Sequence, residues 1–260
     1  MKEFKTLAQY LEESGHADAA IHTRNLGTAL RKTGELPSKL GLEITDGKKG
    51  GVKEEDILVQ IAGEYLIKPH TQELLTSVWQ RFWELAASRA NVDVEIPALE
   101  ITEEEIKEIE NSGDVLYFVP DNISLEDLGK MFPVIGSHWS VQKSSAVTVA
   151  SSHKGWRRAE FDLESSHLKT NEDDLEKLFA EKGREGLDLM EFIILREFSK
   201  ITRGHYLNET ETTSRLLSSC IEGRVVDADS DSDGLLDVYS HLTPGFRGSS
   251  IGGRSSAGVQ

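Results

Sequence analysis

The stretch Arg224-Val-Val-Asp-Ala-Asp-Ser-Asp-Ser-Asp-Gly-Leu-Leu-Asp-Val-Tyr-Ser240 carries the clearest fold signal in the 260-residue chain. Two β-prone runs, Arg224–Asp229 and Leu235–Ser240, flank a short polar tip that contains Gly234. Asp, Ser and Gly between two such runs predict a β-hairpin, because these residues tolerate the backbone angles of tight turns. The sequence therefore predicts antiparallel sheet near its end.

The residues before this hairpin mix strand and helix patterns. β-branched and aromatic runs predict strands, whereas apolar side chains at helical spacing after a Ser or Asn cap predict helices. The predicted strands are Val115–Val119, Ala146–Ala150, Trp156–Leu163 and Arg215–Cys220, and the predicted helices are Ser124–Met131, Glu172–Lys182 and Leu187–Arg203. Together with the hairpin, these elements predict an α+β domain over residues 114–260.

Residues 1–92 show helical periodicity without strand patterns, which predicts a helical N-terminal domain. The apolar spacing places the helices at 4–11, 17–32, 54–66 and 71–90. Trp79 and Trp83 lie four residues apart on a flank of the last helix, where they pack into the core or, alternatively, line a groove for a partner.

The formal net charge of −16 is concentrated in one part of the chain. Between Asp93 and Asp127 there are twelve acidic residues and one basic residue, Lys107, which gives −11. Within this stretch, Thr102 and Glu105 have the spacing of a helical capping box. We therefore predict an acidic joint at 93–113 between the two domains, with its carboxylates on a solvated surface.

Composition argues against several classes of protein. A single cysteine, Cys220, excludes an intramolecular disulfide framework. No apolar run approaches the ~20 residues that span a bilayer, and the start of the chain lacks the apolar core of a signal peptide, so we expect a soluble cytoplasmic protein. The acidic balance argues against nucleic acid as a partner, and a DNA-reading unit around Arg24, Arg31 and Lys32 is the weaker alternative.

The hairpin tip resembles the ligand spacing of a calcium-binding loop. The carboxylates that would ligate calcium are Asp229, Asp231, Asp233 and Asp237. Gly234 follows where such a loop turns tightly, but Ser240 occupies the twelfth position, where the motif requires a bidentate Glu. A calcium site of low affinity and a plain polar turn therefore both remain open.

The tail from Gly245 to Ser256 is rich in Gly and Ser and contains Arg247 and Arg254. Guanidinium and backbone N–H groups in such a segment are suited to binding an anion, which makes these two arginines candidate ligand-binding residues. The alternative is a closing strand of the fold in which Arg254 is paired internally, or a disordered end.

No local motif for catalysis is present. The histidines do not have zinc-site spacing, and no serine lies in a nucleophile elbow. Cys220 is either a nucleophile or a buried apolar residue, and Glu191 with Arg196 forms either an active pair or a plain ion pair. An enzyme would have to assemble its site from scattered residues such as Glu191, Arg215 and His241.

Several segments in a fixed order carry a resemblance. They are Gly186-Leu-Asp-Leu-Met-Glu-Phe-Ile193, Tyr206-Leu-Asn208, Thr212-Thr-Ser-Arg-Leu-Leu217, Gly223-Arg-Val-Val226 and Gly252-Gly-Arg-Ser-Ser256. Over roughly residues 114–260 the chain resembles a group of uncharacterised proteins from small-genome candidate-phylum bacteria. That resemblance implies no activity.

The C-terminal part is also similar to the formylglycine-generating-enzyme and C-type-lectin-like fold. A Leu-led helix with Glu191, a serine-containing strand at 215–219, a hairpin at 224–240 and a closing Gly253-Arg254 follow in that order. The catalytic cysteines of the enzyme branch are absent, so the resemblance implies a ligand-binding scaffold and not the enzyme chemistry.

These observations favour a non-catalytic cytoplasmic binding module whose C-terminal loops contact an unknown protein or small-molecule ligand. The alternatives are an enzyme with a site assembled from scattered residues, and a calcium-stabilised surface domain.

Overall fold

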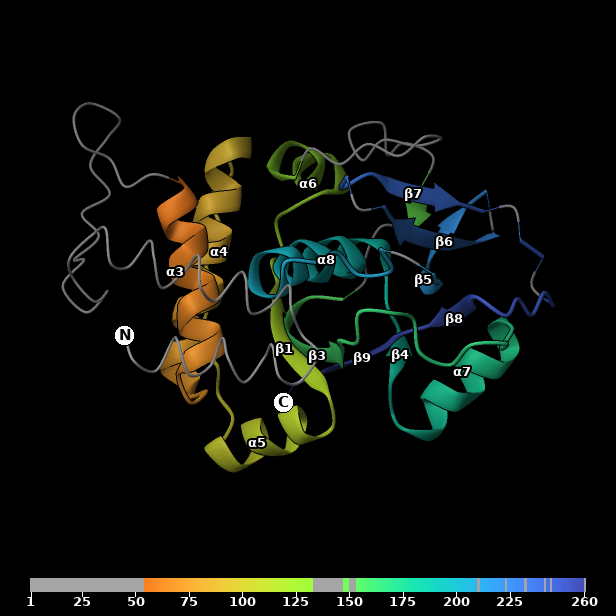
Figure 1. Cartoon of the computed structure of the whole chain (residues 1–260), viewed down its shortest axis with the longest axis horizontal. Coiled ribbons are helices and arrows are strands. Elements are labelled where there is room, and N and C mark those ends of the chain that lie inside the picture. The colour runs from red at the N-terminus through yellow and green to blue at the C-terminus, as the bar shows by residue number, and fades with distance from the viewer. Residues whose placement is uncertain are drawn as a thin grey trace, which may run out of the picture. The chain divides into compact units, whose positions relative to one another are not determined.

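The computed structural model describes residues 54–132, 147–149, 153–209, 211–222, 224–231, 233–240, 242–243 and 245–259 (Figure 1). They form an α+β fold, as predicted. Contacts divide the chain into two units, Met1–Lys68 with Ile201–Gly204 and Pro69–Lys200 with His205–Gln260. The predicted division at 93–113 stays a prediction. In this partition, however, the joint and the predicted helix at 71–90 share a unit with the sheets.

The described part of the first unit consists mainly of helix α3 (Glu54–Ile67), which confirms the helix predicted at 54–66. Lys68 follows it and forms an ion pair of 3.4 Å with Glu64, one helical turn back. The helices predicted at 4–11 and 17–32 lie outside the described residues.

Helix α4 (Gln72–Ala90) begins at the N-cap Thr71, whose side chain accepts a hydrogen bond from Leu74 N–H. The side chains of Trp79 and Trp83 are fully buried. Their indole N–H groups donate to the carbonyl oxygens of Leu116 and Phe118 at 2.9 and 3.1 Å. The two tryptophans therefore belong to the core, as the first of the two interpretations predicted.

The acidic joint, residues 93–113, packs against the rest of the second unit. Helix α5 (Glu103–Asn111) begins with the predicted capping box of Thr102 and Glu105 and buries Ile106 and Ile109. Its carboxylates are exposed. Trp156 Nε1 donates to the carbonyl oxygen of Pro97 at 2.9 Å, which attaches the extended part of the joint to the first sheet.

The first sheet has the antiparallel strand order β1-β3-β9-β4 among the described residues. Its strands are β1 (Asp114–Val119), β3 (Gly155–Glu160), β9 (Ser255–Gly258) and β4 (Glu185–Gly186). The strand predicted at 156–163 ends earlier, at Glu160, because the Leu163 carbonyl accepts a hydrogen bond from Asn208 N–H in a neighbouring loop rather than from a strand.

The second sheet contains the predicted hairpin, and its strands are β2 (Val147–Val149), β5 (Thr213–Ile221), β6 (Arg224–Ser230), β7 (Leu236–Tyr239) and β8 (Ile251–Gly253). Strand β8 runs parallel to β5, with Thr213 opposite Ile251. Because β8 and β9 (Ser255–Gly258) both belong to sheets, the described residues 251–258 match the closing strand that we gave as an alternative, and not a disordered end.

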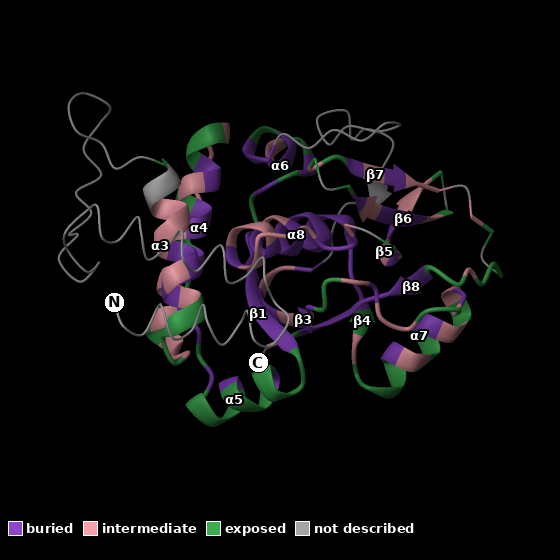
Figure 2. Cartoon of the chain, viewed as in Figure 1, coloured by how far each residue is buried: buried purple, intermediate pink, exposed green. Residues whose placement is uncertain are grey.

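Three further helices are α6 (Leu125–Met131), α7 (Glu172–Glu181) and α8 (Leu189–Arg203), and all but the last three residues of α8 belong to this unit. Helix α8 carries the predicted apolar face, with Phe192, Ile193 and Phe198 fully buried. Figure 2 shows β1 and much of α8 coloured as buried. Among the described residues, no helix has the length and apolar character that crossing a bilayer requires.

Candidate functional site

The strongest polar cluster of the described chain lies at the start of α8. In Asp188-Leu-Met-Glu191, the carboxylate of Asp188 accepts from Glu191 N–H at 2.7 Å, and the carboxylate of Glu191 accepts from Asp188 N–H at 3.0 Å. This reciprocal capping satisfies backbone donors that a helix start leaves without intrahelical partners. It also explains why α8 begins two residues later than the predicted 187. Both side chains are fully buried.

The Glu191 carboxylate joins α8 to three strands of the first sheet and to the residues next to them. Its Oε1 accepts from the Tyr117 hydroxyl and from Arg157 Nε at 2.6 Å. Its Oε2 interacts with His153 Nδ1 at 2.8 Å, Asp188 N–H at 3.0 Å and the Ser256 hydroxyl at 3.3 Å. A carboxylate offers about four lone-pair sites, so these donors engage its whole acceptor capacity.

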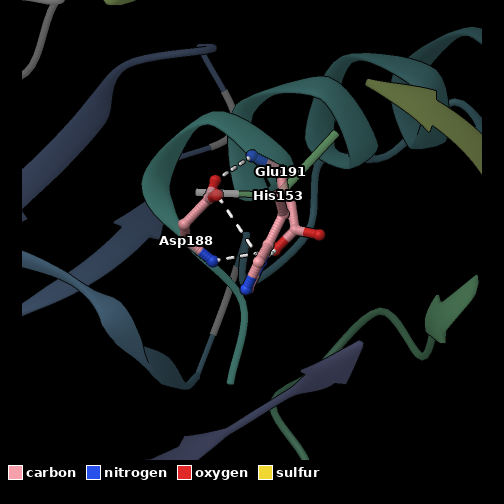
Figure 3. Close-up of side chains that lie close together, drawn as sticks. All are labelled: His153, Asp188 and Glu191. Carbon is pink, nitrogen blue, oxygen red and sulfur yellow. Dashed lines mark hydrogen bonds and ion pairs between the residues drawn. The ribbon is translucent and has the colours of Figure 1, made fainter. Parts of the chain in front are cut away.

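His153 lies between carboxylates on both sides of its ring. Its Nε2 is 2.5 Å from Glu185 Oε2, and its Nδ1 is 3.6 Å from Asp188 Oδ2. Figure 3 shows the side chains of His153, Asp188 and Glu191 close together. The Glu185 side chain is 63% exposed, whereas that of His153 is 7% exposed. The cluster therefore reaches solvent at Glu185.

The protonation of this cluster follows from its charges. Burial favours the neutral form of Glu191, but the hydrogen bond and charge of His153 and the charge of Arg157 outweigh it and hold the pKa of Glu191 below its ordinary value. Burial likewise opposes a charge on His153, but Glu191 raises the pKa of His153 above its ordinary value. Burial and the charge of Glu191 raise the pKa of Tyr117, so its hydroxyl remains a donor. An ionised carboxylate with its lone pairs engaged is poorly placed to accept a substrate proton.

Two of the four predicted calcium ligands, Asp229 and Asp231, accept hydrogen bonds from the second sheet and from the hairpin tip. Asp229 Oδ2 accepts from the hydroxyls of Thr213 and Tyr239 at 2.9 and 2.6 Å. Asp231 Oδ1 accepts from the N–H groups of Asp233 and Leu235, both at 2.9 Å, and Asp237 lies opposite Asp229 in the ladder. Within the described ranges, the one group of three metal-ligating side chains that converge is His153, Asp188 and Glu191. Calcium binding at the tip stays a prediction.

The two predicted ligand-binding arginines have different partners. Arg247 is exposed and forms a two-pronged ion pair with Asp174 at 2.7 and 3.0 Å. Arg254 is fully buried, and its Nη2 donates to Asn208 Oδ1 and to the Leu163 carbonyl, both at 3.1 Å. The contacts of Arg254 match the internal pairing that we gave as the alternative, and a ligand role for either arginine stays a prediction.

The residues proposed for a scattered enzyme site belong to separate clusters. Arg215, fully buried, is paired with Asp227 at 3.3 Å, away from Glu191. Burial raises the pKa of Asp227 to about 6, although the charge of Arg215 lowers it. Arg196 pairs with Glu197 and not with Glu191. Cys220 is half-buried, which differs from the buried position that we expected as the alternative to a nucleophile. His241 lies outside the described residues.

Of four loops next to the second sheet, three are hydrogen-bonded to one another or to its strands, and the fourth is the tip of the β6–β7 hairpin. We call the described residues of 161–170, 205–212, 231–235 and 245–250 the loop layer. Asn208 connects two of these loops, because its N–H donates to the Leu163 carbonyl at 2.7 Å and its carbonyl accepts from Ser230 N–H at 3.1 Å. Further connections include Lys169 N–H to Ile251 O, Gly253 N–H to Ser166 O and Thr213 N–H to Ser250 O.

The loop layer also carries exposed apolar side chains. In the part of the second unit that the structure describes, all the large apolar side chains that are exposed lie in these loops: Leu163, Leu168, Leu235 and Phe246. The charged residues of these loops were predicted from the sequence as candidate site residues, and the exposed apolar residues were not. Leu163, Leu168 and Phe246 each stand singly between polar residues or glycine in the sequence. Such a pattern does not indicate a binding surface, since single exposed apolar residues are common.

His153, Arg157 and Tyr117 were not predicted from the sequence as members of the Glu191 cluster. The Asp188-x-x-Glu191 spacing just before an apolar run was the available signal, because it is a capping-box pattern. The strand residues gave none, since their meeting with Glu191 depends on how distant strands pair.

Comparison of the chain with protein-family models, with curated proteins and with solved structures gave no match. The structure therefore defines an α+β protein with a buried charged cluster and a loop layer. The resemblance to the C-type-lectin-like fold stays a prediction.

Proposed function

We propose that the chain is a non-catalytic cytoplasmic binding module and that a protein partner docks on the loop layer. The observation that carries this proposal is the confinement of the exposed large apolar side chains of the second unit to these loops. Loops held by a rigid scaffold commonly carry binding residues, and exposed apolar side chains on such loops are suited to a protein partner. Phe246 is 45% exposed, and aromatic anchors of this kind supply much of the energy at interfaces.

The loop layer is held in a fixed arrangement, which supports the same proposal. Asn208 is buried and has a left-handed backbone conformation with φ of 56°. Its side chain donates to Thr212 O and Thr212 Oγ1 at 3.0 and 2.8 Å and accepts from Arg254 and Ser214. A surface ordered before binding loses less conformational entropy when a partner docks. On this proposal Arg254 positions the loops from within.

The order of elements supports a C-type-lectin-like scaffold as the finer class. Helix α8 with Glu191, strand β5, the β6–β7 hairpin and the closing strand β9 follow in the order that the resemblance implies. Functional residues of a scaffold concentrate on loops held by a rigid core. The enzyme alternative receives no comparable support, because Glu191 and Arg215 lie in separate ion-pair clusters.

The test is binding by loop variants of the full chain. Partners are captured by cross-linking in the cells that produce the protein, and each captured protein is then purified and its affinity for the chain is measured. We expect Phe246→Ser and Leu168→Ser to weaken binding at least tenfold. Leu66→Ser on α3, whose exposure of 46% matches that of Phe246, should leave it unchanged. Equal affinities for all the variants would show that the loop layer is not the binding surface.

A further inference from the structure

The cluster at the start of α8 contains the donor set of a metal site. His153 Nδ1 and one carboxylate oxygen each from Asp188 and Glu191 lie within 4.8 Å of one another, and all three residues are buried. An imidazole nitrogen together with carboxylate oxygens suits divalent first-row metals such as Zn²⁺. We propose that His153, Asp188 and Glu191 bind one divalent transition-metal ion in place of the hydrogen bond between His153 and Glu191.

The charges of the cluster favour a dication at this point. The carboxylates of Glu185, Asp188 and Glu191 contribute −3, and the guanidinium of Arg157, which lies 2.6 Å from Glu191 and 3.7 Å from Glu185, contributes +1. With a neutral imidazole the remaining charge is −2, which one divalent cation neutralises. Asp188 and Glu191 are fully buried, and a buried carboxylate without a counter-charge carries a large desolvation cost, so a cation bound between them stabilises both.

The surroundings of His153 have the features of an outer shell. Histidines that ligate metals usually donate their second ring N–H to a carboxylate, which fixes the tautomer and the orientation of the ring. Glu185 Oε2, 2.5 Å from Nε2, is placed to accept that N–H and leaves the Nδ1 lone pair directed at Asp188 and Glu191. Because Glu185 is largely exposed, it also marks the side from which an ion would enter.

The distances require only a small adjustment. Two ligand atoms on a tetrahedral zinc ion, each about 2.0–2.1 Å from the metal, are separated by roughly 3.3 Å. His153 Nδ1 lies 3.6 Å from Asp188 Oδ2, close to that value, and 2.8 Å from Glu191 Oε2. The second pair must open by about half an ångström, which a small rotation of the His153 ring provides. Asp188 N–H still bonds to Oε2 of Glu191, so the helix start is preserved.

The test uses the full chain, stripped with a chelator and titrated with Zn²⁺ by calorimetry, with Co²⁺ absorption as a second readout. We expect the wild type to bind one zinc ion per chain. His153→Gln and Asp188→Asn should each lose about 100-fold in zinc affinity. Asn at position 188 keeps an oxygen that can accept the hydrogen bond from Glu191 N–H. His167→Gln is the matched control, because His167 pairs with Glu160 at 2.8 Å elsewhere in the unit, and its affinity should stay within twofold of the wild type.

Glu185→Gln provides a variant that does not disturb the core, since Glu185 is exposed, and we expect it to bind zinc about tenfold more weakly. This variant decides the matter if both core variants fail to fold. Failure of the wild type to bind zinc would overturn the proposal, as would a folded variant of His153, Asp188 or Glu185 with wild-type affinity. Zinc binding that is lost in Asp231→Asn instead would assign the ion to the hairpin tip and also overturn it. Zinc titration of the purified chain requires no partner, so these results do not depend on whether the loop layer binds one.

Discussion

The substitution Glu191→Gln tests whether the buried cluster holds the second unit together. The carboxylate of Glu191 is fully buried and accepts charged donors from Arg157 and His153. Gln has the same shape but carries no charge, and its amide group directs hydrogen-bond donors at existing donors. Removing one partner of a buried ion pair costs about 3–5 kcal/mol, because the remaining charge stays buried without compensation. We therefore expect a loss of that size in the free energy of unfolding.

For a unit of this size, each kcal/mol shifts the melting temperature by roughly 2–4 °C, so the expected decrease is about 6–20 °C. Urea unfolding in the presence of a chelator, followed by the fluorescence of the buried Trp79 and Trp83, measures the free energy directly. Glu176→Gln on the exposed side of α7 is the control and should change stability by less than about 0.5 kcal/mol.

A double-mutant cycle separates the ion pair from general damage to the core. If Arg157 and Glu191 stabilise each other, Arg157→Met combined with Glu191→Gln should cost less than the sum of the single changes by at least about 1 kcal/mol. A loss below about 1 kcal/mol for Glu191→Gln alone, in a variant with native circular dichroism, would refute the reasoning. An additive cycle would show that the stability of α8 and β3 does not depend on this charge pair.

Three further predictions concern other parts of the second unit. Because burial raises the pKa of Asp227 to about 6, the folded state binds its proton more tightly than the unfolded state. The difference in the free energy of unfolding between the wild type and Asp227→Asn should therefore favour the wild type most below about pH 4, and this advantage should fall by up to about 3 kcal/mol by pH 6–7. A difference in urea unfolding that does not change with pH would contradict this. In Gly252→Ala, the new Cβ would lie 2.1 Å from Ser166 O, so unfolding measurements should show a loss of about 1–3 kcal/mol; Gly245→Ala, whose Cβ would meet no described atom within 4 Å, should show almost none. Since Asp231 Oδ1 already accepts two N–H groups, millimolar calcium should leave the melting temperature of chelator-stripped protein unchanged, and a rise that Asp231→Asn abolishes would establish the calcium loop.

The sequence predicted the elements whose signals are local. The β6–β7 hairpin, the capping box of Thr102 and the apolar face of α8 depend on residues a few positions apart, and all are confirmed. The sequence offered a closing strand in this tail only as an alternative, and the bounds and pairing of β8 could not be predicted, because Ile251-Gly-Gly253 has little strand propensity and owes its conformation to parallel pairing with β5, about forty residues earlier. The same limit applies to β4, which has two residues and pairs with β9.

The candidate site shows the same division between local and distant information. Asp188 and Glu191 were within reach of the sequence because they cap a helix together. Their partners on β1 and β3 were not, since alternate residues of a strand face opposite sides and the facing side is set by the pairing register. In the observed register Tyr117 lies opposite Arg157, and this pairing brings both to the Glu191 carboxylate.

The buried cluster and the loop layer are connected through the end of the chain. Ser256 on β9 donates to Glu191 and accepts from Arg157 Nη2 at 2.8 Å, so the charged cluster fixes the closing strand. Arg254, two residues earlier, binds Asn208 and the Leu163 carbonyl and thereby holds two loops of the layer. Because β9 follows β8 after one residue, a shift of the strand at the cluster would move both Arg254 and the loop that carries Phe246. The arrangement therefore makes the order of the proposed binding surface depend on the same carboxylate that holds α8 to the first sheet. On this reasoning, Glu191→Gln should weaken partner binding even in molecules that remain folded, although Glu191 itself is fully buried.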